Sequence, residues 1–206
     1  MTLLLTFITS LLLGMRHATD PDHVIAVTTI VTSERSLGRA ARIGALWGVG
    51  HSLTILLVGG AIIVFKLAFS VRLGLSMELT VAIMLIVLGL LNLFSVNAPS
   101  TCASAGRPLL IGVVHGLAGS AGAALLLVPL IDDPRFAALY LLVFGLGTIV
   151  GMSLVTFAIA VPALAVGTPT ARVQRSLRVG SGAVSVLFGL YLVYGIGIVA
   201  GLFSIR

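Results

Sequence analysis

Long apolar runs are the feature of this sequence that most constrains its fold. A helix needs about 20 apolar residues to cross the hydrocarbon core of a bilayer. The sequence offers six such runs, at roughly 3–31, 41–65, 78–97, 108–131, 136–164 and 179–203. Turn-forming or charged stretches separate them. We therefore predict an all-α integral membrane protein with six transmembrane helices.

Composition supports the same class of protein. The chain has 206 residues, of which 59% are hydrophobic and 9% charged, whereas a soluble domain is about 25% charged. The net charge of +6 could suggest nucleic acid, but the basic residues lie at the ends of apolar runs without aromatic interleaving. The single cysteine, Cys102, excludes an internal disulfide. The first residues lack the basic start of a signal peptide, so we expect them to stay in the first span.

The distribution of basic residues predicts the orientation of the spans. One side of the membrane carries Arg35, Arg39, Arg42, Arg107, Arg172, Arg175 and Arg178; the other carries Lys66, Arg72, Arg135 and Arg206, together with Glu78, Asp132 and Asp133. Because cytoplasmic loops are enriched in Lys and Arg, the first side should be cytoplasmic. Both termini are then expected on the outer side of the cell membrane.

The two halves of the chain resemble each other. The stretch GMRH from Gly14 matches GVVH from Gly112, LWGVGH from Leu46 matches VFGLGT from Val143, and LGL from Leu88 matches FGL from Phe188, all at nearly the same offset. Each half has three predicted spans, an odd number, so the copies should be inverted. We predict one membrane domain, 1–206, built from repeat 1 (about 1–97), a loop (98–107) and repeat 2 (about 108–206). Inverted repeats are typical of transporters.

All four histidines fall inside predicted spans, two of them in the stretch RHATDPDH at 16–23. Ionisable groups at membrane depth are costly and usually mark a site or pathway. Imidazole with one or two carboxylates suits a divalent transition metal. A histidine that only hydrogen-bonds a neighbouring helix is the alternative for each position.

Helix geometry orders the candidates in that stretch. On an ideal helix His17, Asp20 and His23 share one face, and Asp22 points to the other side. Pro21 should kink or open the helix and free the carbonyl of His17, so that Asp22 could join the site. The alternatives for Asp22 are pairing with Arg16 or orienting a ligating histidine.

The second helix and the second half supply the other candidates. His51 is the expected third ligand, with glycines beside it that leave room for the first helix. His115, the counterpart of His17, could complete the site or act as a relay along the exit path. The predicted metal site residues are His17, Asp20, Asp22, His23, His51 and His115. We expect no catalytic residue and no cofactor; the partners are a divalent metal ion and the lipid bilayer, not nucleic acid, and a homo-oligomer is left open.

These residues resemble the signatures of the nickel/cobalt transporter family. RHATDPDHV is similar to the family's first signature, through His17, Asp22 and His23. Gly50-His51-Ser52 resembles the second, and Gly151-Met152-Ser153-Leu154 resembles a Gly-Met-x-Leu segment. The resemblance covers most of the chain and implies a nickel permease that feeds metalloenzyme assembly.

The chain also departs from the larger permeases of that family. They have eight spans, and an acidic signature where this chain reads HGLAGSAGAALL. Thr156 stands where they have an aspartate, and Pro21 where alanine is usual. The chain looks more like the short, urease-accessory-type branch.

The expected function is therefore transport of Ni²⁺, or of Co²⁺, by a secondary permease that is not an enzyme. No GxxxxGK[ST] motif occurs, so no ATP site is expected in this chain. The alternatives are a metal exporter, a membrane accessory protein or scaffold for metalloenzyme maturation, and an oxidoreductase subunit with haem-ligating histidines.

Overall fold

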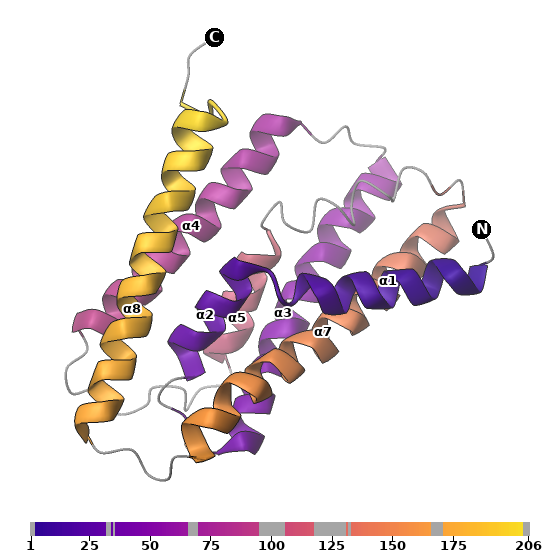
Figure 1. Cartoon of the computed structure of the whole chain (residues 1–206). Coiled ribbons are helices and arrows are strands. Elements are labelled where there is room, and N and C mark those ends of the chain that lie inside the picture. The colour runs from indigo at the N-terminus through magenta and orange to yellow at the C-terminus, as the bar shows by residue number, and fades with distance from the viewer. Residues whose placement is uncertain are drawn as a thin grey trace.

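A computed structural model of the chain describes residues 3–31, 34, 36–65, 70–94, 106–117, 131, 133–165 and 171–203. All regular elements in this part are helices (Figure 1). They are α1 (Leu3–His17), α2 (Pro21–Val31), α3 (Leu37–Phe65), α4 (Val71–Phe94), α5 (Gly106–Gly116), α7 (Pro134–Ala165), α8 (Ala171–Tyr194) and the short π-helix η3 (Gly195–Val199).

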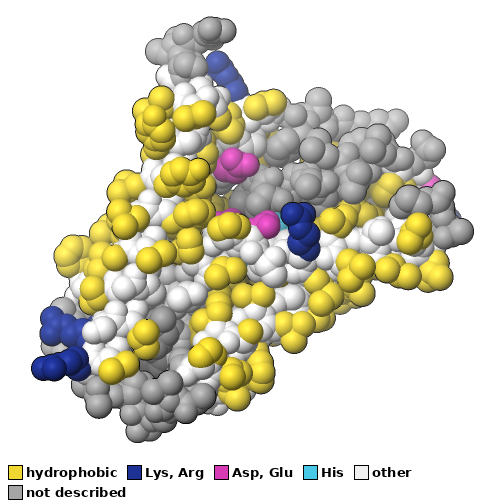
Figure 2. Space-filling view, viewed as in Figure 1, with side chains coloured by type: hydrophobic (Ala, Val, Ile, Leu, Met, Phe, Trp, Pro, Cys, Tyr) yellow, Lys and Arg dark blue, Asp and Glu magenta, His cyan; other side chains and the backbone are white. Residues whose placement is uncertain are grey.

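Within the described residues, four stretches of helix are long and apolar enough to cross a membrane: Leu37–Phe65, Val71–Phe94, Pro134–Pro162 and Arg172–Val199. Large hydrophobic side chains such as Leu57, Leu187 and Tyr191 are exposed on them, and Figure 2 shows hydrophobic side chains over much of the visible surface. Soluble monomers rarely expose apolar patches of this extent. The described part of the chain therefore has the build of a multi-pass helical membrane protein.

Several helices begin before the apolar runs that predicted them. α3 begins at Leu37, α4 at Val71 and α8 at Ala171, because a helix can continue past the hydrocarbon into the headgroup region. The 24 residues of α4 span about 36 Å, against about 30 Å of hydrocarbon. Glu78 therefore lies inside α4, two turns after its start, and not at the end of a span as the sequence predicted.

The first predicted span is two helices. α1 has 15 residues and α2 has 11, or about 22 and 16 Å, so neither alone covers the hydrocarbon. α2 begins at Pro21, the helix position where proline is best tolerated, so the predicted opening of the helix at Pro21 is confirmed. The predicted free carbonyl at His17 is wrong. The chain turns sharply after α1, and the backbone N–H of Asp20 donates to that carbonyl at 3.1 Å.

The span predicted at 108–131 is described only in its first part. α5 ends at Gly116, and residues 118–130 lie outside the described residues, as does most of the predicted loop 98–107 with Cys102. α5, like α1 and α2, is too short to cross the bilayer alone, since its 11 residues span about 16 Å.

The helices pack in pairs around α2. α3 contacts α7, α1 lies along α7, α5 lies along α3, and α4 lies along α8 (Figure 1). α2 touches α3, α4, α7 and α8. Polar side chains join the helices by donating to carbonyls of their neighbours, as is common in membrane proteins. These bonds run from Ser10 to Tyr140 (2.7 Å), Ser52 to Gly145 (3.0 Å), Asn92 to Thr29 (2.8 Å) and Ser185 to Leu85 (2.7 Å).

Glycines form the tightest helix crossings. A Cβ at Gly14 would collide with the carbonyl of Phe144 on α7, and a Cβ at Gly112 would collide with the carbonyl of Trp47 on α3. Because the obstructing atoms are backbone, only a shift of a helix would relieve the contact. The short helices are thus held against α3 and α7 by residues without side chains.

We expect Gly112→Ala to lower the stability of the folded protein, by about 1–3 kcal/mol for overpacking. Gly60→Ala is the matched control, because a Cβ there meets nothing within 4 Å and helix propensity favours alanine. Thermal unfolding of the purified variants in detergent measures both. A Gly112→Ala protein with a Tm equal to that of Gly60→Ala would contradict the tight crossing.

Candidate metal centre

The four histidines converge on one buried cluster, each from a different helix. His17 ends α1, His23 lies in the first turn of α2, His51 is mid-way along α3, and His115 is near the end of α5. His17 is 6% exposed and the other three are 0% exposed. The His23 ring lies 4.6 Å from His17, 5.1 Å from His51 and 4.2 Å from His115, centroid to centroid.

His17 makes a contact with each of its two ring nitrogens. Its Nδ1 lies 2.8 Å from Oδ2 of Asp20, and its Nε2 lies 3.0 Å from Nε2 of His51. An ionised carboxylate only accepts hydrogen bonds, so Nδ1 of His17 carries the proton and Nε2 presents a lone pair. His51 then donates from its own Nε2, which leaves its Nδ1 without a proton.

Asp22 binds two histidines at once. Its Oδ1 accepts from Nδ1 of His23 at 3.2 Å, and its Oδ2 accepts from Nε2 of His115 at 2.9 Å. In an unbroken helix Asp22 would point away from His17 and His23. Because a new helix, α2, begins at Pro21, the Asp22 carboxylate points toward the histidines instead. The alternative that Asp22 pairs with Arg16 is not what the structure shows, because the Asp22 carboxylate accepts from two histidines.

Three buried ring nitrogens have no hydrogen-bond partner among the described residues. They are Nε2 of His23, Nδ1 of His51 and Nδ1 of His115. Buried polar atoms are nearly always paired, so lone pairs left over in this number suit a cation. The ligand atoms of His17, His23 and His51 lie within 4.8 Å of one another, and so do those of Asp22, His23 and His115.

The structure therefore brings all six predicted site residues together. Hydrogen bonds link Asp20, His17 and His51 in one group and His23, Asp22 and His115 in another, and the contact between the His17 and His23 rings joins the two groups. The sequence left two places open for His115, one within the site and one along an exit path. The structure places it within the cluster, hydrogen-bonded to Asp22.

Sequence reasoning missed the aromatic neighbours of the cluster. The Trp47 ring lies 5.5 Å from His23 and 5.4 Å from His115, and the Phe144 ring lies 5.7 Å from His17. Trp47 is the one tryptophan of the chain, and Phe144 is its partner in the predicted repeat. Trp47 lies one turn before His51, and Phe144 lies one turn before Thr148. This matched placement could have indicated that both aromatic rings pack against the site.

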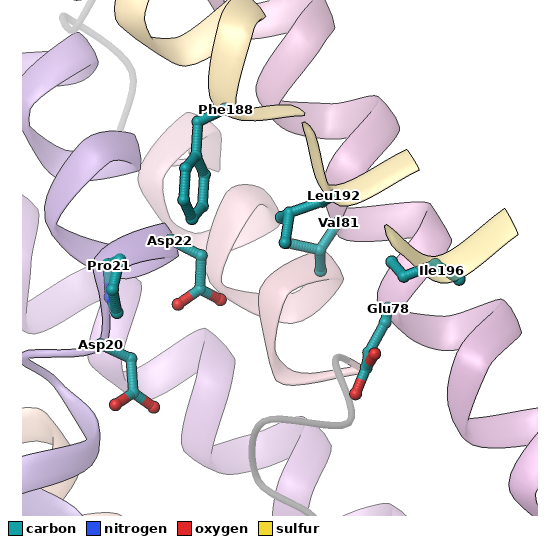
Figure 3. Close-up of a pocket in the computed structure, with 8 residues that line it drawn as sticks. All are labelled: Asp20, Pro21, Asp22, Glu78, Val81, Phe188, Leu192 and Ile196. Atoms are coloured by element: carbon teal, nitrogen blue, oxygen red, sulfur yellow. The ribbon is translucent and has the colours of Figure 1, made fainter. Parts of the chain in front are cut away.

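A cavity of about 310 Å³ adjoins the cluster. Figure 3 shows Asp20 and Asp22 at the start of α2, Glu78 on α4, and apolar side chains of α4, α8 and η3. The residues that line it are Asp20, Pro21, Asp22, Glu78, Val81, Phe188, Leu192 and Ile196. Glu78 was missed as a site residue because the predicted span began at it. A span begun at Val71 would have marked it as a carboxylate at membrane depth.

The Gly-Met-x-Leu segment lies at a helix crossing. A Cβ at Gly151 would meet the backbone of Met15 on α1, and Met152 is 0% exposed in the core. Thr156, which stands where the larger permeases have an aspartate, donates to the carbonyl of Met152 at 2.6 Å and lies against Gly44. In this chain the segment serves the packing of α7.

Comparison with known proteins yields one informative relative. The chain is 34% identical over 211 residues to the urease accessory protein UreH of Bacillus sp. (strain TB-90), covering 94% of this chain and 92% of that protein. No family model matches the chain. No solved structure matches it either.

The fold and the cluster define a class: a multi-pass helical membrane protein with a buried histidine–carboxylate centre. Within that class, the identity and its extent along both chains decide the family. The chain belongs to the UreH-like branch of the nickel/cobalt transporter family, as its signatures had indicated. This membership points to a transport or accessory protein rather than a catalyst.

We expect Asp22→Asn to weaken binding of Ni²⁺ by the purified protein more than Asp20→Asn does. Asp22 holds two histidines and Asp20 holds one, and loss of a carboxylate that orients a ligating histidine typically costs about 10–100-fold in metal affinity. Competition with a chelating dye measures both variants. Equal affinities for the two variants would contradict the bridging role of Asp22.

Proposed function

We propose that the chain is a secondary permease that carries a divalent transition metal ion across the cell membrane, with Ni²⁺ as the favoured substrate and Co²⁺ as the next. The observation that carries this proposal is the buried cluster of four histidines, three of which have a ring nitrogen without a partner among the described residues. Such groups at membrane depth are costly and usually mark an ion pathway.

The ligand types in the cluster support Ni²⁺. Neutral imidazole suits Zn, Cu, Fe and Ni, whereas sites made of carboxylate, carbonyl and water suit Mg, Ca and Mn. Membership of the family favours nickel among the first group.

In this proposal the histidines are the direct ligands and the aspartates orient them. His17, His23 and His51 supply nitrogens that lie within 4.8 Å of one another. Asp20 and Asp22 occupy the opposite ring nitrogens of His17 and His23, which is where an orienting carboxylate stands in metal sites. This differs from the first sequence interpretation, which made Asp22 a ligand, and agrees with its stated alternative.

We further propose that the two halves are inverted repeats, so that the six predicted spans form two bundles of three. Contacts that exchange between the halves support this. A Cβ at Gly14 would meet the carbonyl of Phe144, and a Cβ at the matched Gly112 would meet the carbonyl of Trp47, the match of Phe144. The same exchange holds for Gly147 with Leu11 and Gly50 with Leu109, and for Gly89 with Val186 and Gly189 with Ile86. Each pair consists of matched positions of the predicted repeat, as a two-fold relation requires.

Transport would follow from rocking of these halves about the cluster, as in other transporters with inverted repeats. Asp22 of the first half accepts from His115 of the second half, so the cluster lies where the halves meet. We propose that both termini face the outside of the cell membrane, because the larger share of arginine lies in the opposite loops.

A second candidate is a membrane accessory role in metalloenzyme maturation without transport. The printed name of the relative, a urease accessory protein, favours it. Export is the third, because the same cluster could serve either direction.

The first experiment is accumulation of radioactive nickel in cells that express the wild type, His17→Ala or His51→Ala. We expect the wild type to raise accumulation above cells with an empty vector, and both variants to abolish the rise, because each removes one imidazole of the proposed ligand set. Thr80→Ala, at an exposed position of α4, is the control and should accumulate nickel like the wild type.

The opposite outcomes separate the candidates. A fall below the empty vector, lost in both histidine variants, would make the protein an exporter with the same site. Wild-type accumulation equal to the vector, with urease activation still dependent on the protein, would favour the accessory role and sink the permease.

A further inference from the structure

The cavity beside the histidine cluster lies on one side of the bundle, between α2, α4 and α8. Its lining includes Glu78, which lies two turns or about 10 Å from the start of α4, and Ile196 of η3, at the far end of α8. η3 is π-helical, a rare form that often occurs at functional sites. The cavity therefore faces the side of the membrane where α4 begins and η3 ends.

Among the described residues that line the cavity, every charged side chain is acidic. These side chains are Asp20, Asp22 and Glu78. Figure 3 shows Asp20 and Asp22 near each other at the start of α2, with Glu78 on α4 across from them. Figure 2 shows acidic side chains near the middle of the view, with hydrophobic side chains and one basic side chain close by. Carboxylates next to apolar walls attract a cation strongly, because low-dielectric surroundings focus their field.

The three carboxylates are not equivalent. Asp20 and Asp22 are engaged by histidines. Glu78 makes no hydrogen bond or ion pair with any described residue, and it is only partly buried. Its charge is thus available to a mobile ion, whereas the charges of the two aspartates are partly used to hold the imidazoles.

The cavity connects to the cluster through Asp22. Its carboxylate belongs to the cavity lining and also accepts from His23 and His115. Their remaining nitrogens, Nε2 of His23 and Nδ1 of His115, are buried and unpaired among the described residues. A cation that reaches Asp22 from the cavity is one side chain away from unused nitrogen ligands.

The size of the cavity determines whether an ion can keep its hydration shell there. Six waters occupy about 180 Å³ at about 30 Å³ each, which is less than the cavity volume of about 310 Å³. A divalent ion can therefore lie there with its hydration shell. The histidine rings beyond Asp22 are packed at centroid distances of 4.2–6.0 Å, so the ion must lose water to go further.

We propose that this cavity is the chamber in which the hydrated divalent cation is first captured, and that Glu78 is the residue that captures it. Glu78 attracts the ion with its shell intact, and the histidines replace the waters afterwards. This inference rests on the proposed transport function and adds to it a residue outside the histidine cluster and the family's signatures.

The test is the initial rate of Ni²⁺ uptake by cells expressing the full chain, measured over a range of free Ni²⁺ concentrations. Glu78→Gln should raise KM about threefold to tenfold, because a charge that steers and concentrates the ion is lost, and should leave Vmax close to that of the wild type. Glu78→Asp keeps the charge and should stay near the wild-type KM.

Asp133→Asn is the matched control. It removes one negative charge at the start of α7, outside the cavity lining, where Asp133 accepts from the backbone N–H of Arg135 at 2.8 Å. Asparagine serves equally well at such a helix start. We expect its KM to equal that of the wild type.

A second variant leaves Glu78 in place. Leu192→Cys, in a Cys102→Ala background, puts a thiol in the cavity lining. Attachment of a positively charged thiol reagent should raise KM severalfold, and attachment of a neutral reagent of the same size should raise it clearly less.

Three results would overturn the inference. These are an unchanged KM in Glu78→Gln, a fall in Vmax alone, or equal effects of the charged and the neutral reagent, each with a wild type that transports Ni²⁺. Such results would leave the proposed transport function standing. A wild type that moves no Ni²⁺ would overturn both.

Discussion

The break between α1 and α2 is the constraint on which the rest of the site depends. Backbone groups at membrane depth must find partners within the protein. Here the N–H of Asp20 donates to the carbonyl of His17, and the N–H of His23 donates to the carbonyl of Asp20. Pro21, which has no N–H of its own, starts the new helix. His17 then ends one helix while Asp22 and His23 begin another, and their side chains meet.

Burial of four imidazoles requires a second set of interactions. The two aspartates satisfy one nitrogen each of His17, His23 and His115. The tight glycine crossings bring α1 close to α7 and α5 close to α3, so that the His17 ring contacts Phe144 and the His115 ring contacts Trp47. Packing and polarity are therefore linked. A bulkier residue at Gly112 would move α5 and with it His115, the partner of Asp22. The bond between Asp22 and His115 also ties the two halves of the chain together.

The cluster and the cavity divide the proposed work of transport between two environments. The cavity has room for water and carries a carboxylate free of protein partners among the described residues, so it suits capture of an ion by charge alone. The cluster is buried and offers nitrogen ligands close to one another, so it suits recognition of the metal. Selectivity placed after capture has a physical advantage, because the ligand field acts only on an ion that has lost its waters.

Hydropathy, the cost of charge in hydrocarbon and the chemistry of proline are local properties. The sequence alone was therefore sufficient for the membrane class, for the opening at Pro21 and for naming the six residues that the structure brings together. It failed where the answer depended on the approach of distant helices. The direction of the Asp22 carboxylate follows from the position of His115 on α5, and the aromatic contacts of the cluster follow from the crossings of α3 and α7 with the short helices. Glu78 was misplaced because the predicted span began at this residue, whereas α4 begins two turns earlier, at Val71. Only the packing of α4 and α8 beside α2 shows that this carboxylate shares a cavity with Asp20 and Asp22.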